Sequence, residues 1–147
     1  MAPAIRSVLG EGPIWHSGRS VLLWVDILRS LIFSLDPATA ETRTFEFGEH
    51  SSTVTTVVPV RNSVSSVVLG TTEGVALFDL DTGVVEQHRS NPVHGEWTRM
   101  NDGKCDPQGR LWVGSVAKDG PPPANTIPGG AALYVYEGFD SEPTPVI

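Results

Sequence analysis

The feature that most constrains the fold of this chain is a repeated pattern of short apolar segments. The segment LIFSLDPATAETRTFEF aligns with a later one, VALFDLDTGVVEQHR, so that Phe33 and Phe78 lie 45 positions apart. Asp36 and Asp81 are separated by the same 45 positions. A period of about 40 to 45 residues, with about four strands per unit, is typical of the blades of a β-propeller.

A third copy of this pattern covers residues 110–116 and 132–136. Between its two apolar segments lies GPPPANTIPGG at 120–130, which we expect to be an insertion loop because it is rich in Pro and Gly. The chain therefore predicts about three blades.

The secondary structure is predicted to be all-β. Short segments rich in Val, Leu, Phe and Thr alternate with clusters of Gly, Pro, Asn and Asp, and no segment keeps the i, i+3, i+4, i+7 pattern of an amphipathic helix across three turns. The predicted strands cover residues 21–27, 31–35, 43–47, 55–60, 65–71, 75–79, 84–88, 110–116 and 132–136.

The predicted number of blades conflicts with the geometry of a closed ring. The 147 residues fit one domain, 1–147, whereas propellers close with about 4 to 8 blades. Three explanations stay open. The chain is the N-terminal half of a longer protein, two copies close one ring as a homodimer, or the chain is a truncated product that folds poorly.

Charge and cysteine content exclude several classes of function. Lys and Arg total 10 against 17 Asp and Glu, a net charge of -7 that disfavours binding to nucleic acid. The single cysteine, Cys105, allows neither an internal disulfide nor a thiolate-rich metal site. The longest apolar run, at 21–28, is too short to span a bilayer, and no signal-peptide pattern opens the chain. We therefore expect a cytoplasmic protein without membrane contacts.

Two motifs carry the candidate chemistry: LGEGPIW at 9–15 and RMNDGKCDPQGRLWVGS at 99–115. In each, a polar residue stands beside Gly just before a strand pattern, where the inner strand of a blade would begin near the central channel. Together with ALYVYE near the C-terminus, these sequence motifs resemble those of the SMP-30/gluconolactonase/LRE family. The resemblance runs from about Val8 to the end of the chain and covers the first half of the family's propeller.

The resemblance implies a six-bladed propeller that holds one divalent cation in its channel and hydrolyses sugar lactones. Glu11 matches the family's metal-binding Glu, for Ca²⁺ or Zn²⁺, with Mn²⁺ or Mg²⁺ as further possibilities. Arg99 and Asn101 match the pair that contacts the substrate. The other metal ligands and the general base come from later blades of the family, so no catalytic residue is expected in this chain. No role is transferred to residues 117–119, where the family has an acidic substrate contact.

Several of these residues also have an ordinary structural explanation. Glu11 could belong to a turn before a strand, and the sequence Asn-Asp-Gly at 101–103 is itself a good turn. We expect Asp102, Lys104, Asp106 and Gly109 to serve turns only.

Other chemically capable residues are also expected to be structural. The sequence DLDTG at 79–83 is predicted to be a turn rather than a calcium loop, since the downstream Glu of such a loop is out of register. Cys105 is expected to be a small filler inside the turn. The histidines are expected in solvated loops or at strand edges, and the tryptophans between blades, with the edge of the channel as an alternative for Trp97. The residues concerned are His16, His50, His88 and His94, and Trp15, Trp24, Trp97 and Trp112.

Two functions from different classes remain. The first is a metal-dependent sugar lactonase, and the second is a non-catalytic half-propeller that binds a partner or completes another chain. A propeller like strictosidine synthase or an arylesterase is a third possibility, which the motif R-x-N-D-G-K disfavours.

Overall fold

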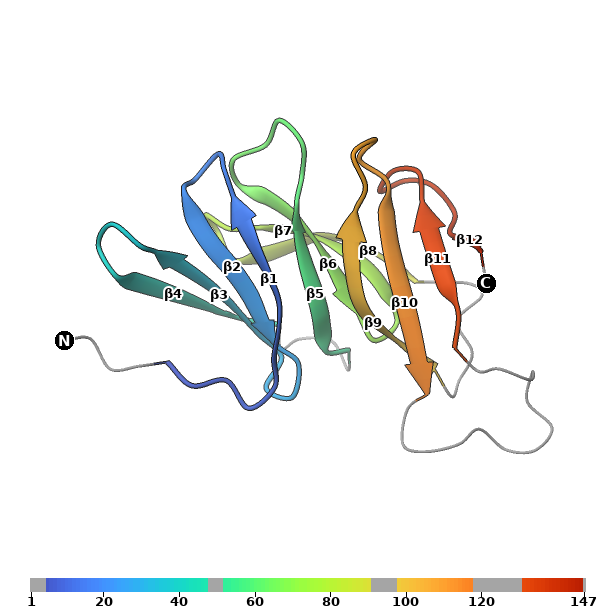
Figure 1. Cartoon of the computed structure of the whole chain (residues 1–147), viewed down its shortest axis with the longest axis horizontal. Coiled ribbons are helices and arrows are strands. Elements are labelled where there is room, and N and C mark those ends of the chain that lie inside the picture. Colours follow the sequence, from blue (N-terminus) through green and yellow to red (C-terminus); the bar gives the residue numbers. More distant parts are fainter. Residues whose placement is uncertain (1–4, 48–51, 91–97, 118–130, 147) are drawn as a thin grey trace.

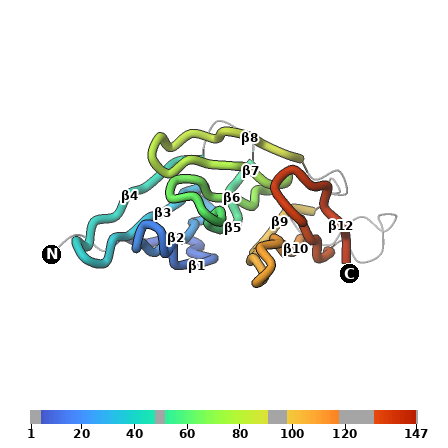
Figure 2. The backbone as a smooth tube through the Cα atoms, turned by 90° about the horizontal axis from the view of Figure 1, so that it is seen from above, coloured from blue at the N-terminus to red at the C-terminus, as the bar shows by residue number. Residues whose placement is uncertain are grey.

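The structure, a computed structural model, describes residues 5–47, 52–90, 98–117 and 131–146. These residues form twelve strands and no helix, which confirms the predicted all-β class. No helix that could cross a membrane occurs in this part of the chain. The strands form three four-stranded antiparallel sheets, which Figure 2 shows side by side in an arc.

The bounds of the strands are as follows. The first sheet contains β1 (Gly10–His16), β2 (Val21–Asp26), β3 (Leu31–Asp36) and β4 (Glu41–Glu46). The second contains β5 (Val54–Pro59), β6 (Ser66–Thr71), β7 (Gly74–Asp79) and β8 (Val84–Ser90). The third contains β9 (Thr98–Cys105), β10 (Leu111–Ala117), β11 (Leu133–Tyr136) and β12 (Thr144–Pro145).

Each sheet follows the chain from its first strand to its last, so that β1, β5 and β9 lie next to one another and the later strands lie farther out (Figure 1).

All nine predicted strands are confirmed. The sequence pattern missed β1, β9 and the two-residue β12. The segments of β1 and β9 contain Gly, Pro, Asn and Asp, which disfavour strands in isolation. Their pairing with β2 and β10 overrides that local preference.

The repeat has the predicted period but a different alignment at the third strand. The second strands β2, β6 and β10 begin at Val21, Ser66 and Leu111, 45 residues apart. By contrast, β3 and β7 begin 43 residues apart, because four residues join β2 to β3 and only two join β6 to β7.

The aspartate that ends the third strand shows the same shift. Asp36 ends β3 and its Oδ1 accepts a hydrogen bond from Ala38 N at 2.8 Å. Asp79 ends β7 and its Oδ1 accepts one from Asp81 N at 3.0 Å. Asp36 therefore corresponds to Asp79, and its alignment with Asp81 was wrong by two residues.

Two apolar cores lie between neighbouring sheets. The core between the first and second sheets and the core between the second and third both form because alternate residues of each strand face the adjacent sheet. In the first core, the Phe45 and Phe78 rings pack edge to face with centroids 5.6 Å apart. The largest fully buried side chains are Phe78, Leu23, Ile32, Leu69, Leu80 and Met100.

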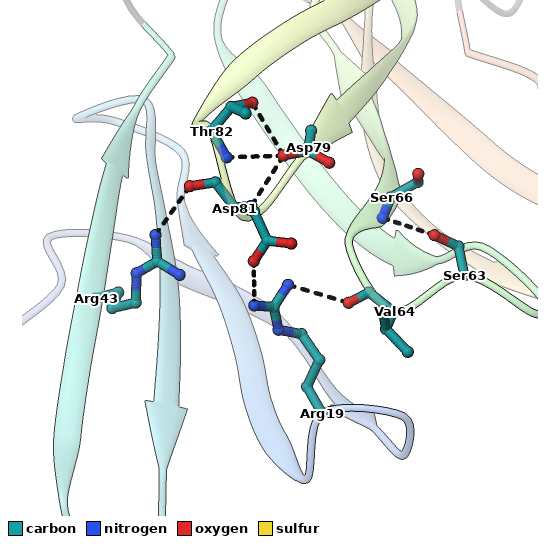
Figure 3. A network of polar contacts seen from close by, with 8 residues as sticks. All are labelled: Arg19, Arg43, Ser63, Val64, Ser66, Asp79, Asp81 and Thr82. Carbon is teal, nitrogen blue, oxygen red and sulfur yellow. Dashed lines mark hydrogen bonds and ion pairs between the residues drawn. The ribbon is translucent and has the colours of Figure 1, made fainter.

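Polar contacts between turns join the first two sheets (Figure 3). The Arg19 guanidinium, in the turn after β1, forms an ion pair with Asp81 and donates to Val64 O at 3.1 Å. Arg43 of β4 donates to Asp81 O at 3.4 Å. The Asp79 carboxylate organises the turn that carries Asp81, and hydrogen bonds from the backbone and hydroxyl of Thr82 help to lower its pKa to about 2. The turn predicted at 79–83 is confirmed.

Candidate functional site

The candidate site lies on the inner strands, where all three carry an irregularity of the same kind. The pairing of β1 with β2 shifts between Glu11 and Ile14, and that of β5 with β6 between Val54 and Thr56. The pairing of β9 shifts opposite Val113 and Ser115. Each shift inserts one extra residue in the inner strand. A β-bulge of this kind bends a strand and redirects its side chains, and bulges are common beside functional sites.

Glu11 is exposed and directly precedes the first bulge, which consists of Gly12 and Pro13. The segment before it is fixed to β2 by Asp26, whose fully buried carboxylate accepts hydrogen bonds from Val8 N at 2.8 Å and Leu9 N at 3.2 Å. Gly12 follows Glu11 with a φ of 60°, in the left-handed region that favours glycine. A Cβ at Gly12 would lie 3.3 Å from Thr56 Oγ1 and 3.5 Å from Asp102 Oδ1. The first bulge therefore sits directly against the other two.

The third bulge contains Asn101, and Arg99 lies just before it, paired with Val116. Arg99 and Asn101 are both half-buried on β9. The Arg99 Nη1 donates to Asn101 Oδ1 at 3.1 Å and to Met100 O at 3.1 Å. The two predicted residues are therefore in direct contact, and the guanidinium holds the amide in one orientation.

Thr56 and Asp102 connect the bulges, and the sequence analysis missed this role for both. The Thr56 hydroxyl lies 3.3 Å from Asp102 Oδ1 and 3.2 Å from Gly103 O. Asp102 Oδ1 also accepts from Gly103 N at 2.8 Å. The extra residue in β5 gave no signal in the sequence because a Val- and Thr-rich strand looks regular whatever its register.

The structure places Glu11 and Asn101 within strands, each beside the residue that makes the contact between bulges. Glu11 precedes Gly12, and Asn101 precedes Asp102. Because Gly12 lies against Asp102, the strand segments that carry these two predicted residues are brought together. The sequence separation of ninety residues is closed by the packing of β1, β5 and β9.

Four residues of the motif at 99–115 were expected to serve turns, and two of these predictions were right and two wrong. Asp106 and Gly109 form the expected turn, since Asp106 Oδ1 accepts from Gln108 N and Arg110 N, each at 3.0 Å. Asp102 and Lys104 do not: both lie within β9. Cys105 ends β9 and is exposed, rather than lying inside the turn as expected.

The structure also corrects one histidine and one tryptophan. His16 is 2% exposed at the end of β1, where a solvated position was expected. Trp15 is 50% exposed, where packing between blades was expected. His88 is exposed on the edge strand β8, as predicted. His50, His94, Trp97, the loop at 120–130 and residues 118–119 lie outside the described residues.

The residues present do not by themselves fit a complete metal centre. No group of three or more His, Cys, Asp or Glu that could hold an ion occurs among the residues that the structure describes. Glu11 offers one carboxylate, and a hard cation such as Ca²⁺ takes six to eight oxygen ligands. Any metal site that includes Glu11 needs ligands from elsewhere.

Three four-stranded sheets in an arc, with their first strands innermost, are three blades of a β-propeller. The chain belongs to the SMP-30/gluconolactonase/LRE-like family, whose model matches residues 9–144.

Individual relatives agree with this assignment. The chain is 35% identical over 115 residues to YvrE of Bacillus subtilis, a match that covers 78% of this chain and 38% of that protein. It is 33% identical over 110 residues to the 6-deoxy-6-sulfogluconolactonase of Pseudomonas putida, covering 75% and 36%. Among solved structures, the calcium-binding protein regucalcin from Agrobacterium tumefaciens has a TM-score of 0.78 at 22% identity, covering 97% of this chain and 44% of that one. The chain thus spans less than half the length of each of these relatives.

Proposed function

We propose that this chain supplies the first blades of a propeller that hydrolyses sugar lactones. The observation that carries the proposal is the convergence of three inner-strand bulges, which brings the segments of Glu11 and Asn101 together in a member of this family. The named activity of the Pseudomonas putida relative supports the substrate class.

In this proposal Arg99 and Asn101 bind and orient the lactone. The Asn101 oxygen accepts from Arg99, which leaves the amide NH₂ of Asn101 as a donor to a substrate oxygen. The remaining N–H groups of the Arg99 guanidinium can donate to ring or hydroxyl oxygens. Holding the lactone in one orientation removes much of the entropic barrier to attack by water.

Glu11 is proposed as one ligand of a divalent cation, with the other ligands and the general base contributed from outside this chain. Such an ion, when bound, polarises a carbonyl and lowers the pKa of water. Ca²⁺ and Zn²⁺ are the proposed ions, and Mn²⁺ and Mg²⁺ are alternatives. A second copy of the chain could close the ring and supply the missing blades. We propose a cytoplasmic location and no nucleic-acid or membrane partner.

The test measures lactone hydrolysis and thermal stability in parallel. A complete ring that contains this chain as its first blades, either a closed dimer or a longer form of the protein, is assayed with glucono-1,5-lactone in a pH-stat, with and without each cation, and its melting temperature is recorded under the same conditions. A cation that binds the native state must raise the melting temperature. We expect Glu11→Gln to reduce that rise and Asn101→Ala to lower kcat/KM at least about tenfold. Glu41→Gln, on the exposed start of β4, is the matched control and should change neither the rise in melting temperature nor kcat/KM.

The competing function is a non-catalytic half-propeller that acts as a binding or assembly module. It is favoured by the incomplete set of metal-ligating residues in the described chain. Absence of hydrolysis together with an unchanged melting temperature in every cation would contradict the lactonase and support this module. A raised melting temperature without hydrolysis would retain Glu11 as a ligand but exclude lactone hydrolysis by this chain.

A further inference from the structure

A cleft between the second and third sheets is not used by the proposed reaction. It has a volume of about 370 Å³, within the size range of small-molecule sites. One wall comes from β5 to β8 and the other from β9 to β11 with the loop that follows. Most of its lining is apolar, including Val58, Val68, Val75, Leu77, Leu111 and Phe139. The acidic Asp140 also lines the cleft, and its carboxylate is paired with Arg89 at 3.5 Å.

One wall of the cleft contains a buried donor without an acceptor. Tyr136 is 3% exposed, and its hydroxyl forms no hydrogen bond. Burial raises the pKa of this phenol well above its usual value, so Tyr136 keeps its proton at neutral pH. A buried hydroxyl without a partner is unfavourable, and an acceptor placed in the cleft would satisfy it.

Arg61 places a positive charge at the rim of the cleft. Its Nη2 donates to Pro107 O at 3.2 Å, and none of the ion pairs among the described residues involves it. A Cβ at Gly109 would lie only 2.9 Å from Nη2, so the guanidinium occupies space that a larger residue would fill. The geometry holds Arg61 against the third sheet with donors still available.

Arg61 also lines a second cavity of about 530 Å³, which adjoins the first. The two share Pro59, Val60, Arg61, Cys105 and Gly109. His16 lines this second cavity, and both of its ring nitrogens lack hydrogen-bond partners. Asp106 lines the second cavity as well, but its carboxylate is already paired with Arg110 at 2.7 Å. The apolar cleft thus continues, past Arg61, into a larger and more polar cavity.

The cleft is separate from the candidate site on the inner strands. It lies at the ends of β5 and β9, near Pro59 and Cys105, whereas the bulges lie earlier in the same strands. The hairpin turns that follow these ends are gathered at the top of Figure 1. Both walls belong to this chain, so the cleft does not depend on any further blade.

We propose that this cleft binds a small carboxylic acid with an apolar body. The apolar walls accommodate the body, and Arg61 and the Tyr136 hydroxyl are donors for which a carboxylate is the complementary acceptor. An uncharged apolar molecule of the same size would leave the cation without a counter-charge. The binding site is distinct from lactone hydrolysis and does not require it.

The test compares 4-phenylbutyrate with 4-phenyl-1-butanol, which has the same carbon skeleton without the charge. Dissociation constants are measured by calorimetry on the full 147-residue chain, and the binding position by ¹H–¹⁵N NMR shifts. We expect the acid to bind at least about tenfold more tightly than the alcohol, with shifts at Leu111 and Tyr136. Arg61→Gln should abolish this preference, and Tyr136→Phe should weaken binding of the acid several-fold.

Arg43→Gln is the matched control, since Arg43 lies on β4 in the first sheet, away from the cleft. Equal affinity for acid and alcohol would overturn the proposal, as would equal losses in Arg61→Gln and Arg43→Gln. Unchanged binding in Tyr136→Phe, or shifts confined to other residues, would place the ligand elsewhere and also reject the cleft.

Discussion

At the scale of single residues, Gly12 is a position where both backbone conformation and side-chain size matter for the candidate site. Its φ of 60° is unfavourable for a residue with a Cβ, and that Cβ would press on Thr56. Gly12→Ala should therefore lower the free energy of unfolding by about 1 to 2 kcal/mol, measured by urea denaturation. Gly138→Ala is the control because no atom lies within 4 Å of its added Cβ, and it should change stability by less than about 0.5 kcal/mol. Equal effects would show that the bulges are not tightly packed.

His16 gives the protein a predictable pH dependence. Burial first, and then the nearby Arg19 charge, lower its pKa below the ordinary 6.5. Because the unfolded chain then binds more protons than the folded one, stability falls as the pH drops below about 6.5 towards the folded pKa. Urea midpoints between pH 7.5 and 5 should decrease, with a smaller slope in His16→Gln. An equal slope in both proteins would assign the effect to other groups.

At the scale of elements, the hairpin turns of the first sheet end in residues with positive φ. Ser20, Ser30 and Ala40 directly precede β2, β3 and β4, with φ of 56°, 53° and 59°. In the second sheet, the turn before β8 ends in Gly83 with φ 74°. The turn before β4 therefore contains strain that glycine avoids in the turn before β8.

Ala40→Gly should relieve that strain. We expect a gain of about 0.5 to 1 kcal/mol in the free energy of unfolding. The left-handed region costs alanine about 1 to 2 kcal/mol, and the greater conformational entropy of glycine in the unfolded chain offsets part of the relief of that cost. Ala38→Gly, in the same turn without a positive φ, is the control and should give no gain. Differential scanning calorimetry measures the stability of both variants. A gain in both would contradict the explanation that Ala40→Gly relieves backbone strain.

At the scale of the whole molecule, the three blades form an arc whose first and last sheets each have one face without a neighbouring blade. The half-exposed Trp15 on β1 shows that the inner edge of the first sheet is not fully covered. Uncovered apolar residues of this kind favour association with further blades.

If two copies close one ring, the mass in solution should approach twice 15.8 kDa as the protein concentration rises. Light scattering coupled to size exclusion measures this directly, and the fluorescence of Trp15 should shift to the blue on assembly as it loses contact with water. A constant mass of 15.8 kDa with unchanged fluorescence would exclude ring closure by a second copy. The proposed site would then need blades from a longer form of this protein or from another protein.

Much of the fold could be predicted from the sequence because it depends on local periodicity. The all-β class, nine of the twelve strands and the 45-residue spacing of the second strands all follow from alternating apolar residues between turn signals. The turns at Asp79 and Asp106 followed from Asx chemistry, which acts over two to four residues. The candidate residues Glu11, Arg99 and Asn101 came from a family resemblance, and their chemical roles remain proposals.

Only the tertiary structure decided what depends on contacts between blades. Strands β1 and β9 form despite their Gly, Pro and Asn content because neighbouring strands satisfy their backbone groups. Residues that are tens of positions apart form the Thr56 to Asp102 contact, bury His16 and line the cleft beside Arg61. The bulges likewise depend on how neighbouring strands pair. Local sequence patterns carry no information about such pairs. The sequence by itself therefore determined the blades and their period, and the packing of those blades determined which polar groups meet.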